Sequence, residues 1–148
     1  MARTSKQPGR TRLLNFFELA ANARLVDLPG YGYAEGAREE RDLWGALIDA
    51  LLTRHSLRGV LVVVDARRGL LAGDRQLLTW AQQRQFDVHV LLSKADQLSR
   101  SAGMQCLRRV EQELAGAVSA QLFSAHSGAG VEQARLRLAH WLQPGSAA

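Results

Sequence analysis

Apolar residues form two kinds of pattern along this chain, short runs and helical spacings. Near the N-terminus, two apolar segments at residues 13–19 and 24–28 flank the small residues 20–23, which predicts a β-hairpin. After a stretch punctuated by proline and glycine, apolar residues line one face of a predicted helix, at positions 43, 44, 47, 48, 51 and 52. That face is wide, so we expect it to be buried.

Three strand-then-helix units follow. The predicted strands are Gly59–Asp65, Val88–Ser93 and Gln121–Ser124. The first helix begins near Asp74, and the other two carry apolar residues at helical spacing, namely Met104, Leu107, Val110 and Leu114, then Val131, Ala134, Leu138, Trp141 and Leu142. This alternation predicts an α/β fold with a mostly parallel sheet, and the almost continuously apolar strands indicate helices on both of its faces.

Composition narrows the class of protein. The chain has 148 residues, of which 47% are hydrophobic and 22% are charged, so a disordered linker is excluded and a single domain is expected. The longest apolar run, Val60–Val64, is far shorter than the roughly 20 residues of a membrane helix, and no secretory signal is present. Cys106 is the only cysteine, which favours a reduced, cytoplasmic setting.

The net charge of +5 is unevenly distributed. Arg3, Lys6, Arg10 and Arg12 all precede the first acidic residue, Glu18, so the basic charge forms a short N-terminal arm on a near-neutral body. Two interpretations stay open for this arm. It either contacts RNA or phosphate, or it is a solvated, flexible end.

Candidate chemistry follows the strand ends, because ligands of open parallel sheets bind there. The sequence has four short motifs at these places, Asp27–Gly30, Asp65–Arg67, Ser93–Asp96 and Phe123–Ala125. The first has the form D-x-x-G, in which a carboxylate can hold Mg²⁺ and a glycine N–H can approach a terminal phosphate. Ordinary turn chemistry is the alternative for this motif.

The motif Ser93-Lys94-Ala95-Asp96 is similar to the [N/T]-K-x-D motif of GTPases. There, the Asp carboxylate accepts hydrogen bonds from two guanine N–H groups while the Lys stem lies over the base, and adenine is rejected. The alternative is that Ser93 or Asp96 caps a helix. Phe123-Ser124-Ala125 matches a motif whose backbone N–H binds the guanine carbonyl oxygen.

Taken in order, these motifs resemble the EngB (YihA, YsxC) family of bacterial GTPases. The resemblance includes A-R-T-S-K-Q-P-G-R-T at residues 2–11 and D-L-P-G-Y-G-Y-A at residues 27–34, and it covers Met1 to about Leu142. It implies a three-layer, Ras-like P-loop GTPase fold over residues 1–143, followed by a tail at residues 144–148. It also implies GTP or GDP with Mg²⁺ as ligands.

The biological role implied by the resemblance is a switch in assembly of the large ribosomal subunit, needed for cell division and septation. Its partners would be guanine nucleotide and the ribosomal large subunit or its RNA, with no membrane. We expect a monomer. Even with a complete phosphate site, hydrolysis is expected to be slow, because Tyr31 stands where Ras-like proteins place a water-orienting glutamine.

The resemblance assigns nucleotide contacts residue by residue. The implied nucleotide-binding residues are Gly9, Arg10, Thr11, Arg12, Leu13, Asp27, Leu28, Pro29, Gly30, Ser93, Lys94, Ala95, Asp96, Phe123, Ser124 and Ala125. Of these, Thr11 and Asp27 are implied ligands of Mg²⁺. Arg12 stands where the family commonly has glutamine, so this contact departs from the family pattern.

The largest departure is the absence of a G-x-x-x-x-G-K-[ST] loop from these 148 residues. In the family, this loop and the first strand precede the residue 2–11 motif, so we expect both to be missing and GTP binding to be weak or undetectable. The strands that end at Asp27 and Asp65 would then either pair with each other or expose apolar edges. We interpret this absence as the expected result of a start site placed too late, and a nucleotide-free RNA- or ribosome-binding module is the alternative.

The histidines and tryptophans point to no further chemistry. His55, His89, His126 and His140 lack metal-ligand spacing, so surface or packing roles are expected for them. The tryptophans, at positions 44, 80 and 141, fall in predicted helices, and we expect core packing there.

Overall fold

A computed structural model describes residues 14–20, 23–28, 45–46, 49–51, 53 and 56–143 of the protein. The chain divides into two compact units, residues 1–50 and residues 51–148. The single domain expected over residues 1–143 therefore stays a prediction.

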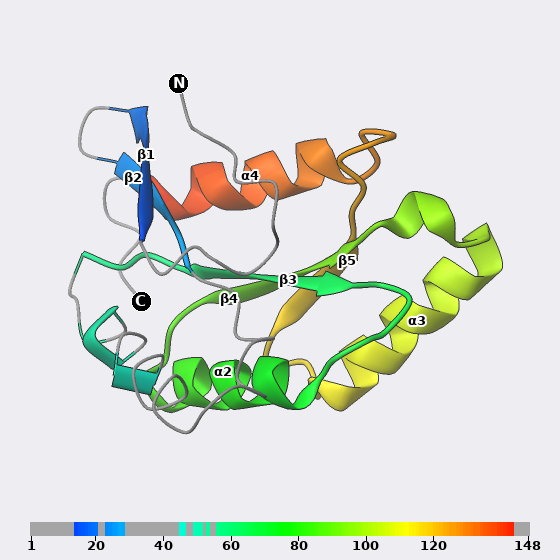
Figure 1. Cartoon of the computed structure of the whole chain (residues 1–148), viewed down its shortest axis with the longest axis horizontal. Coiled ribbons are helices and arrows are strands. Elements are labelled where there is room, and N and C mark those ends of the chain that lie inside the picture. The colour runs from blue at the N-terminus through cyan, green and yellow to red at the C-terminus, as the bar shows by residue number, and fades with distance from the viewer. Residues whose placement is uncertain are drawn as a thin grey trace. The chain divides into compact units, whose positions relative to one another are not determined.

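The first unit contains the predicted β-hairpin (Figure 1). Strands β1 (Asn15–Ala20) and β2 (Ala23–Asp27) pair in antiparallel fashion with Asn15 opposite Asp27, and a bulge interrupts the register near the turn. Its apolar side chains are largely exposed, with Phe16 at 52%. A two-stranded sheet is only marginally stable by itself, so the hairpin depends on packing outside its own two strands.

The helix predicted around residues 43–52 is present in part. Residues 45–46 and 49–51 are helical. Most of its apolar positions, 43, 44, 47, 48 and 52, lie outside the described residues, so the burial of that face stays a prediction.

The second unit contains a parallel sheet of three strands in the order β3–β4–β5. These strands are β3 (Val60–Asp65), β4 (Val88–Ser93) and β5 (Ser119–Leu122), and they are linked by helices α2 (Ala72–Gln83), η2 (Ala95–Gln97), α3 (Arg100–Glu113) and α4 (Val131–Trp141). Figure 1 shows α2 and α3 on one face of the sheet and α4 on the other. The predicted α/β class, with a parallel sheet and helices on both faces, is confirmed.

The core of this unit is centred on β4, the middle strand. Val90 and Leu92 have no exposed surface, and all the residues of β4 before Ser93 are buried. The outer strand β3 alternates instead, with Val62 and Val64 buried and Val63 exposed by 62%. The apolar sequence of β4 thus fits a strand that is covered on both faces. Strand β3 is at least as apolar, but its exposed Val63 departs from the expected cover on both faces.

Helix α3 buries part of the apolar stripe that its spacing identified. Val110 and Leu114 are buried, whereas Met104 is 41% exposed. Gly103 and Cys106 are also buried on this helix. A Cβ atom on Gly103 would lie 3.3 Å from Leu122 Cδ1, so the missing side chain lets the helix approach β5 closely.

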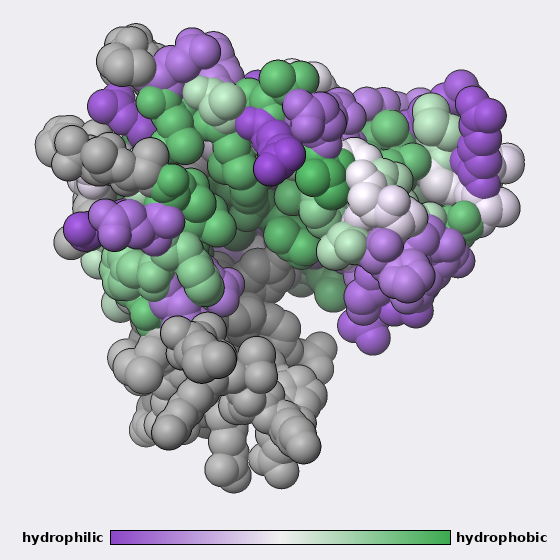
Figure 2. All heavy atoms as spheres, turned by 90° about the horizontal axis from the view of Figure 1, so that it is seen from above, coloured by the Kyte–Doolittle hydropathy of each residue, from purple (hydrophilic) through white to green (hydrophobic). Residues whose placement is uncertain are grey.

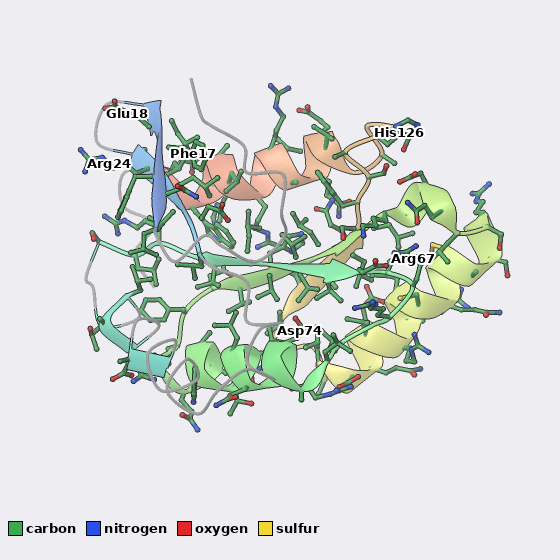
Figure 3. All side chains as sticks on the ribbon, in the orientation of Figure 1. Phe17, Glu18, Arg24, Arg67, Asp74 and His126 are labelled. Atoms are coloured by element: carbon green, nitrogen blue, oxygen red, sulfur yellow. The ribbon has the colours of Figure 1, made fainter. Side chains whose placement is uncertain are left out.

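The other two long helices also differ slightly from prediction. Helix α2 begins two residues before Asp74, because the Asp74 carboxylate accepts the Leu71 N–H at 2.6 Å in the first turn (Figure 3). Trp141, at the end of α4, is buried as predicted and donates its indole N–H to Asp87 Oδ2 at 2.6 Å. Leu142, which was predicted to continue the helix, follows its last residue and is 42% exposed.

Without the missing first strand, the strands that end at Asp27 and Asp65 were expected either to pair with each other or to leave apolar edges exposed. No described pairing joins β2 to β3, since they belong to separate sheets. Large apolar side chains are exposed in the second unit, with Val63 at 62% and Leu136 at 64%. Figure 2 shows apolar surface interspersed with polar surface over the described residues.

Candidate functional site

Three of the four predicted motifs meet at one edge of the β3–β4–β5 sheet. Parallel strands bring their carboxyl ends to the same edge, and Asp65 at the end of β3 is paired in register with Ser93 at the end of β4. Figure 3 places the labelled Arg67 and His126 at this end of the sheet. The fourth motif, Asp27–Gly30, follows β2 in the other unit.

Hydrogen bonds from both neighbouring strands fix the backbone of the Ser93–Asp96 loop. The Ser93 hydroxyl donates to the Val64 carbonyl at 2.9 Å, and the Ser93 carbonyl accepts the Ala66 N–H at 2.9 Å. On the other side, the Ala95 N–H donates to the Phe123 carbonyl at 3.1 Å. Lys94 adopts the left-handed conformation, with φ of 58°, which turns the chain sharply out of the sheet.

These bonds exclude the capping alternative for Ser93 and Asp96. Helix α3 is capped by Ser99, whose hydroxyl accepts the Ala102 N–H at 3.2 Å. The short helix η2 begins after Lys94 and has no side-chain cap. Ser93 instead bonds to β3, and Asp96 bonds to Ser124, as described next.

A fully buried serine holds the Asp96 carboxylate. The Ser124 hydroxyl donates to Asp96 Oδ1 at 2.5 Å, and its oxygen accepts the N–H groups of His126 and Ser127 at 3.2 and 3.1 Å. The hydrogen bond from Ser124 lowers the pKa of Asp96, so the carboxylate is ionised at neutral pH. The result is a negatively charged acceptor that is exposed to ligands and held in one orientation.

Next to this carboxylate lies an available hydrogen-bond donor. Ala125 is exposed, and within the described part of the chain its backbone N–H makes no hydrogen bond. Asp96 can accept two N–H groups and Ala125 can donate to a carbonyl oxygen. Guanine presents this combination on its hydrogen-bonding edge, whereas adenine presents an amine beside an unprotonated ring nitrogen.

Asp65, the last residue of β3, forms an ion-paired cluster with Arg67 and Lys94. The Asp65 carboxylate accepts the Arg67 Nε–H on Oδ1 at 2.9 Å and the Arg67 Nη2 on Oδ2 at 2.5 Å. The Lys94 ammonium also reaches Oδ2, at 3.1 Å. The hydrogen bonds from Arg67 hold the pKa of Asp65 well below its usual range, so the cluster is charged at neutral pH.

Comparison with known proteins decides the family. The family described as 50S ribosome-binding GTPase matches residues 1–94. Proteins named Probable GTP-binding protein EngB are 49% identical over 99% of this chain and 73% of their own in Thiobacillus denitrificans, and 48% identical over 96% of this chain and 74% of their own in Stenotrophomonas maltophilia. This chain belongs to the EngB family of GTP-binding proteins.

The fold agrees with this family. Elongation factor SelB from Methanococcus maripaludis, solved with the GTP analogue GppNHp, superposes with a TM-score of 0.66 and is 20% identical over 87% of this chain and 27% of its own. Its apo form gives a TM-score of 0.65. At this identity the similarity shows the fold alone, which is that of a Ras-like GTPase domain. The predicted family and fold are therefore confirmed.

The predicted phosphate-side residues of this EngB family member are mostly not described. Gly9, Arg10, Thr11, Arg12, Leu13, Pro29 and Gly30 lie outside the described residues. Asp27 is exposed at the end of β2, and Leu28 is half-buried. The described residues contain no group of three His, Cys, Asp or Glu side chains that could hold a metal, so the pairing of Thr11 with Asp27 on Mg²⁺ stays a prediction.

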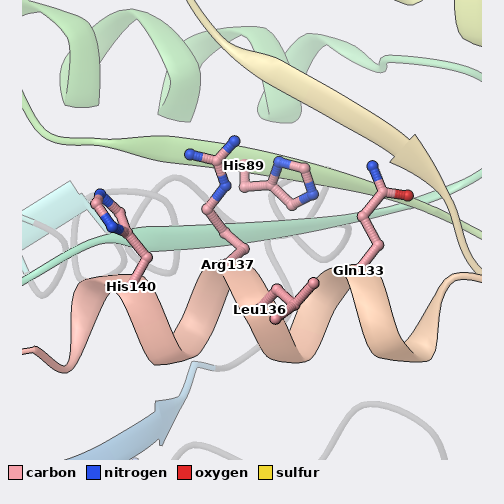
Figure 4. A pocket seen from close by; sticks show the side chains of 5 residues that line it. All are labelled: His89, Gln133, Leu136, Arg137 and His140. Carbon is pink, nitrogen blue, oxygen red and sulfur yellow. The ribbon is translucent and has the colours of Figure 1, made fainter.

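A hollow of about 410 Å³ lies elsewhere, between β4 and α4 (Figure 4). It is lined by His89, Gln133, Leu136, Arg137 and His140. His89 is 2% exposed, and its two ring nitrogens contact Ser119 Oγ at 2.7 Å and Gln121 Oε1 at 2.9 Å. Because its partners come from β5, His89 has the packing role that was predicted for it.

Sequence reasoning missed two side-chain roles at the strand-end site. Ser124 was expected to matter through its backbone, yet its hydroxyl holds Asp96. Asp65 was recognised as a strand-end residue but received no role. The register of β3 against β4 is the information that brings it next to Lys94, and apolar runs alone do not fix that register.

The sequence predicted no membrane-spanning segment, and the helices of the structure bear on this prediction. No helix among the described residues has both the length and the apolar character needed to cross a bilayer.

Proposed function

We propose that Lys94, Asp96 and Ala125 form the base-binding half of a guanine-nucleotide site. The observation that carries this proposal is the ionised Asp96 carboxylate, held by Ser124 beside the unused N–H of Ala125. The name of the EngB relatives, GTP-binding protein, supports the same ligand.

Each group has a distinct task in this proposal. Asp96 accepts hydrogen bonds from the ring N–H and the exocyclic amine of guanine, Ala125 donates to the guanine carbonyl, and the Lys94 stem covers the base. Bound adenine leaves Asp96 without a donor and Ala125 without an acceptor. Unpaired polar groups of this kind make an analogue bind much more weakly.

The phosphate contacts are proposed for two other segments, which the family resemblance implies. Residues 9–13 and 27–30 serve the phosphates, with Thr11 and Asp27 as oxygen ligands of Mg²⁺, which would neutralise phosphate charge when bound. The exposed strand-end carboxylate of Asp27 has the donor chemistry that Mg²⁺ prefers. These 148 residues carry no G-x-x-x-x-G-K-[ST] loop, so the affinity expected for them is weak, on the order of millimolar.

At the cellular level we propose a GTP-dependent switch in assembly of the large ribosomal subunit, acting as a cytoplasmic monomer and needed for normal division and septation. The matched family, described as ribosome-binding, supports this role. The basic residues 3–12 are proposed to contact ribosomal RNA, so binding to large-subunit particles should weaken steeply with salt. Particle binding that ignores guanine nucleotide would favour the nucleotide-free binding module instead.

An NMR titration of the 148-residue chain tests the base site directly. GDP should shift the backbone amide signals of residues 94–96 and 125, whereas ADP at the same concentration should not. Asp96→Asn should lose the GDP response and gain one for xanthosine diphosphate, since the Asn amide can donate to the extra xanthine carbonyl.

The matched control is Glu132→Gln, which removes an exposed carboxylate on α4 and should leave the GDP response unchanged. Equal shifts with GDP and ADP, or a GDP response that survives in Asp96→Asn, would contradict the proposal.

A further inference from the structure

The Asp65 carboxylate binds two cations at the carboxyl edge of the sheet. Arg67 reaches both of its oxygens, and the Arg67 backbone N–H adds a third bond to Oδ1 at 3.0 Å. Lys94 binds Oδ2 from the neighbouring strand end at 3.1 Å. None of these contacts is needed to build the sheet, since the β3–β4 pairing is complete without them.

Asp65 is the fixed member of this cluster. Its side chain is 17% exposed, whereas those of Arg67 and Lys94 are 46% and 52% exposed. The two-point contact from Arg67 fixes the plane of the carboxylate, because a guanidinium and a carboxylate match in geometry. Oδ2 is therefore presented to Lys94 in a defined direction.

Lys94 is fixed along its backbone but long and flexible in its side chain. Its loop is bonded to both β3 and β5, so only the side-chain rotamers stay open. Within the described residues, Asp65 is the ionic partner of its ammonium group. A lysine side chain that is free before binding loses rotamer freedom when a ligand orders it, which weakens binding. A lysine that is already held by an ion pair loses less.

We propose that Asp65 is a positioning residue for guanine-nucleotide binding, which acts by holding the Lys94 ammonium so that its stem lies ready beside Asp96. This inference rests on the proposed base site. Asp65 acts through Lys94 and does not touch the base. Arg67, two residues further along, supports the carboxylate, which gives the Asp65–Arg67 motif a role in the same site.

A double-mutant cycle read by GDP titration tests this role. Asp65→Asn keeps the size of the side chain and removes its charge, and it should weaken GDP binding about threefold to tenfold. Lys94→Met keeps an apolar stem over the base and removes the ammonium. In the Lys94→Met background, Asp65→Asn should have no further effect on GDP affinity, because the group it acts through is gone.

The matched control is Glu113→Gln. Glu113 is a carboxylate in an ion pair with Arg75, between α3 and α2, so it has the same chemistry without Lys94. Its loss should leave GDP affinity unchanged. A second measurement needs no nucleotide. NMR relaxation of the Lys94 ε-methylene should show an ordered side chain in the wild-type chain and a more mobile one in Asp65→Asn.

Each result separates the two ideas. If the wild-type amides at 94–96 and 125 do not respond to GDP even at concentrations above the expected millimolar affinity, the base site is overturned and this inference with it. If GDP binds but Asp65→Asn costs the same in both backgrounds, Asp65 is merely structural and only this inference is overturned.

If Asp65→Asn does not fold, Arg67→Gln keeps the carboxylate and loosens it. This variant should weaken GDP binding in the same direction by a smaller factor and increase the mobility of Lys94. Unchanged affinity together with unchanged Lys94 mobility would overturn the inference.

Discussion

Two polar clusters of the second unit show how a site differs from packing. Around His89, both ring nitrogens are bonded to β5, and Gln121 also donates to the Gly130 carbonyl at 2.7 Å. At the strand ends, Asp96 is held by Ser124 but stays exposed, and the N–H of Ala125 makes no bond within the described chain. In the cluster around His89, the polar groups bond to one another. In the strand-end cluster, the Asp96 carboxylate and the Ala125 N–H are left to bond a ligand.

The largest expected effect comes from a substitution at Gly130, which disrupts the hydrogen-bonded cluster around His89. At φ of 76°, a Cβ atom there would collide with the Leu122 carbonyl oxygen and lie 2.7 Å from Gln121 Nε2. Gly130→Ala should lower the free energy of unfolding by about 2–4 kcal/mol, measured by denaturant titration. Gly116→Ala is the control, because Gly116 has φ of 75° and open space, so it should cost only roughly 1 kcal/mol. Equal losses would mean that the collision is relieved.

The next effect is the pH dependence of the His89 cluster. Burial lowers the pKa of His89, so the folded protein binds fewer protons than the unfolded chain. Stability is then complete above the unfolded pKa of about 6.5 and falls as the pH drops below it. We expect the free energy of unfolding to fall as the pH is lowered from 7.5 to 5.5.

His89→Gln should remove most of this pH dependence, whereas replacement of the exposed His126 by Gln should keep it. An unchanged pH profile in His89→Gln would show that another group titrates.

A pair of serine variants sharpens the comparison between the two clusters. Ser124→Ala removes the hydroxyl that holds Asp96 and should weaken GDP binding about tenfold. Ser119→Ala removes the hydroxyl that contacts His89 and should leave GDP affinity unchanged. Both are measured by the amide titration. Equal effects on GDP binding would mean that the two clusters are not functionally distinct.

The smallest effect is expected for an ion pair outside both clusters. Glu113→Gln removes the carboxylate that pairs with Arg75 on the surface of the helices, where solvent screens the interaction. The melting temperature should change by less than about 2 °C in a calorimetric scan. A larger fall would place this pair among the structural contacts of the unit.

The sequence predicted the elements of the second unit and three of the groups at the strand ends. Strands β3 and β4 are almost continuous apolar runs, whereas β5 is not one and begins two residues before the predicted Gln121. Lys94, Asp96 and Ala125 belong to local motifs that are readable along the chain. The contacts of Asp65 with Lys94 and of Ser124 with Asp96 join residues 29 and 28 positions apart. They depend on strand register, which the pattern of apolar residues does not fix.

The exposure of Met104 shows what helical spacing leaves undecided. Val110 and Leu114 of the apolar stripe are buried, but the closest approach of α3 to β5 is at Gly103, which has no side chain. A missing side chain is invisible to a search for apolar side chains, although it decides which face comes nearest to the sheet.

The pinned backbone of the Ser93–Asp96 loop has a consequence for signalling. In the proposed base site, a loop bonded on both sides is complete before any nucleotide arrives, and it is proposed to contact the base and not the phosphates. Such a loop would distinguish one nucleoside from another and would not sense the number of phosphates. The proposed switch between GTP and GDP would then depend on segments other than this one.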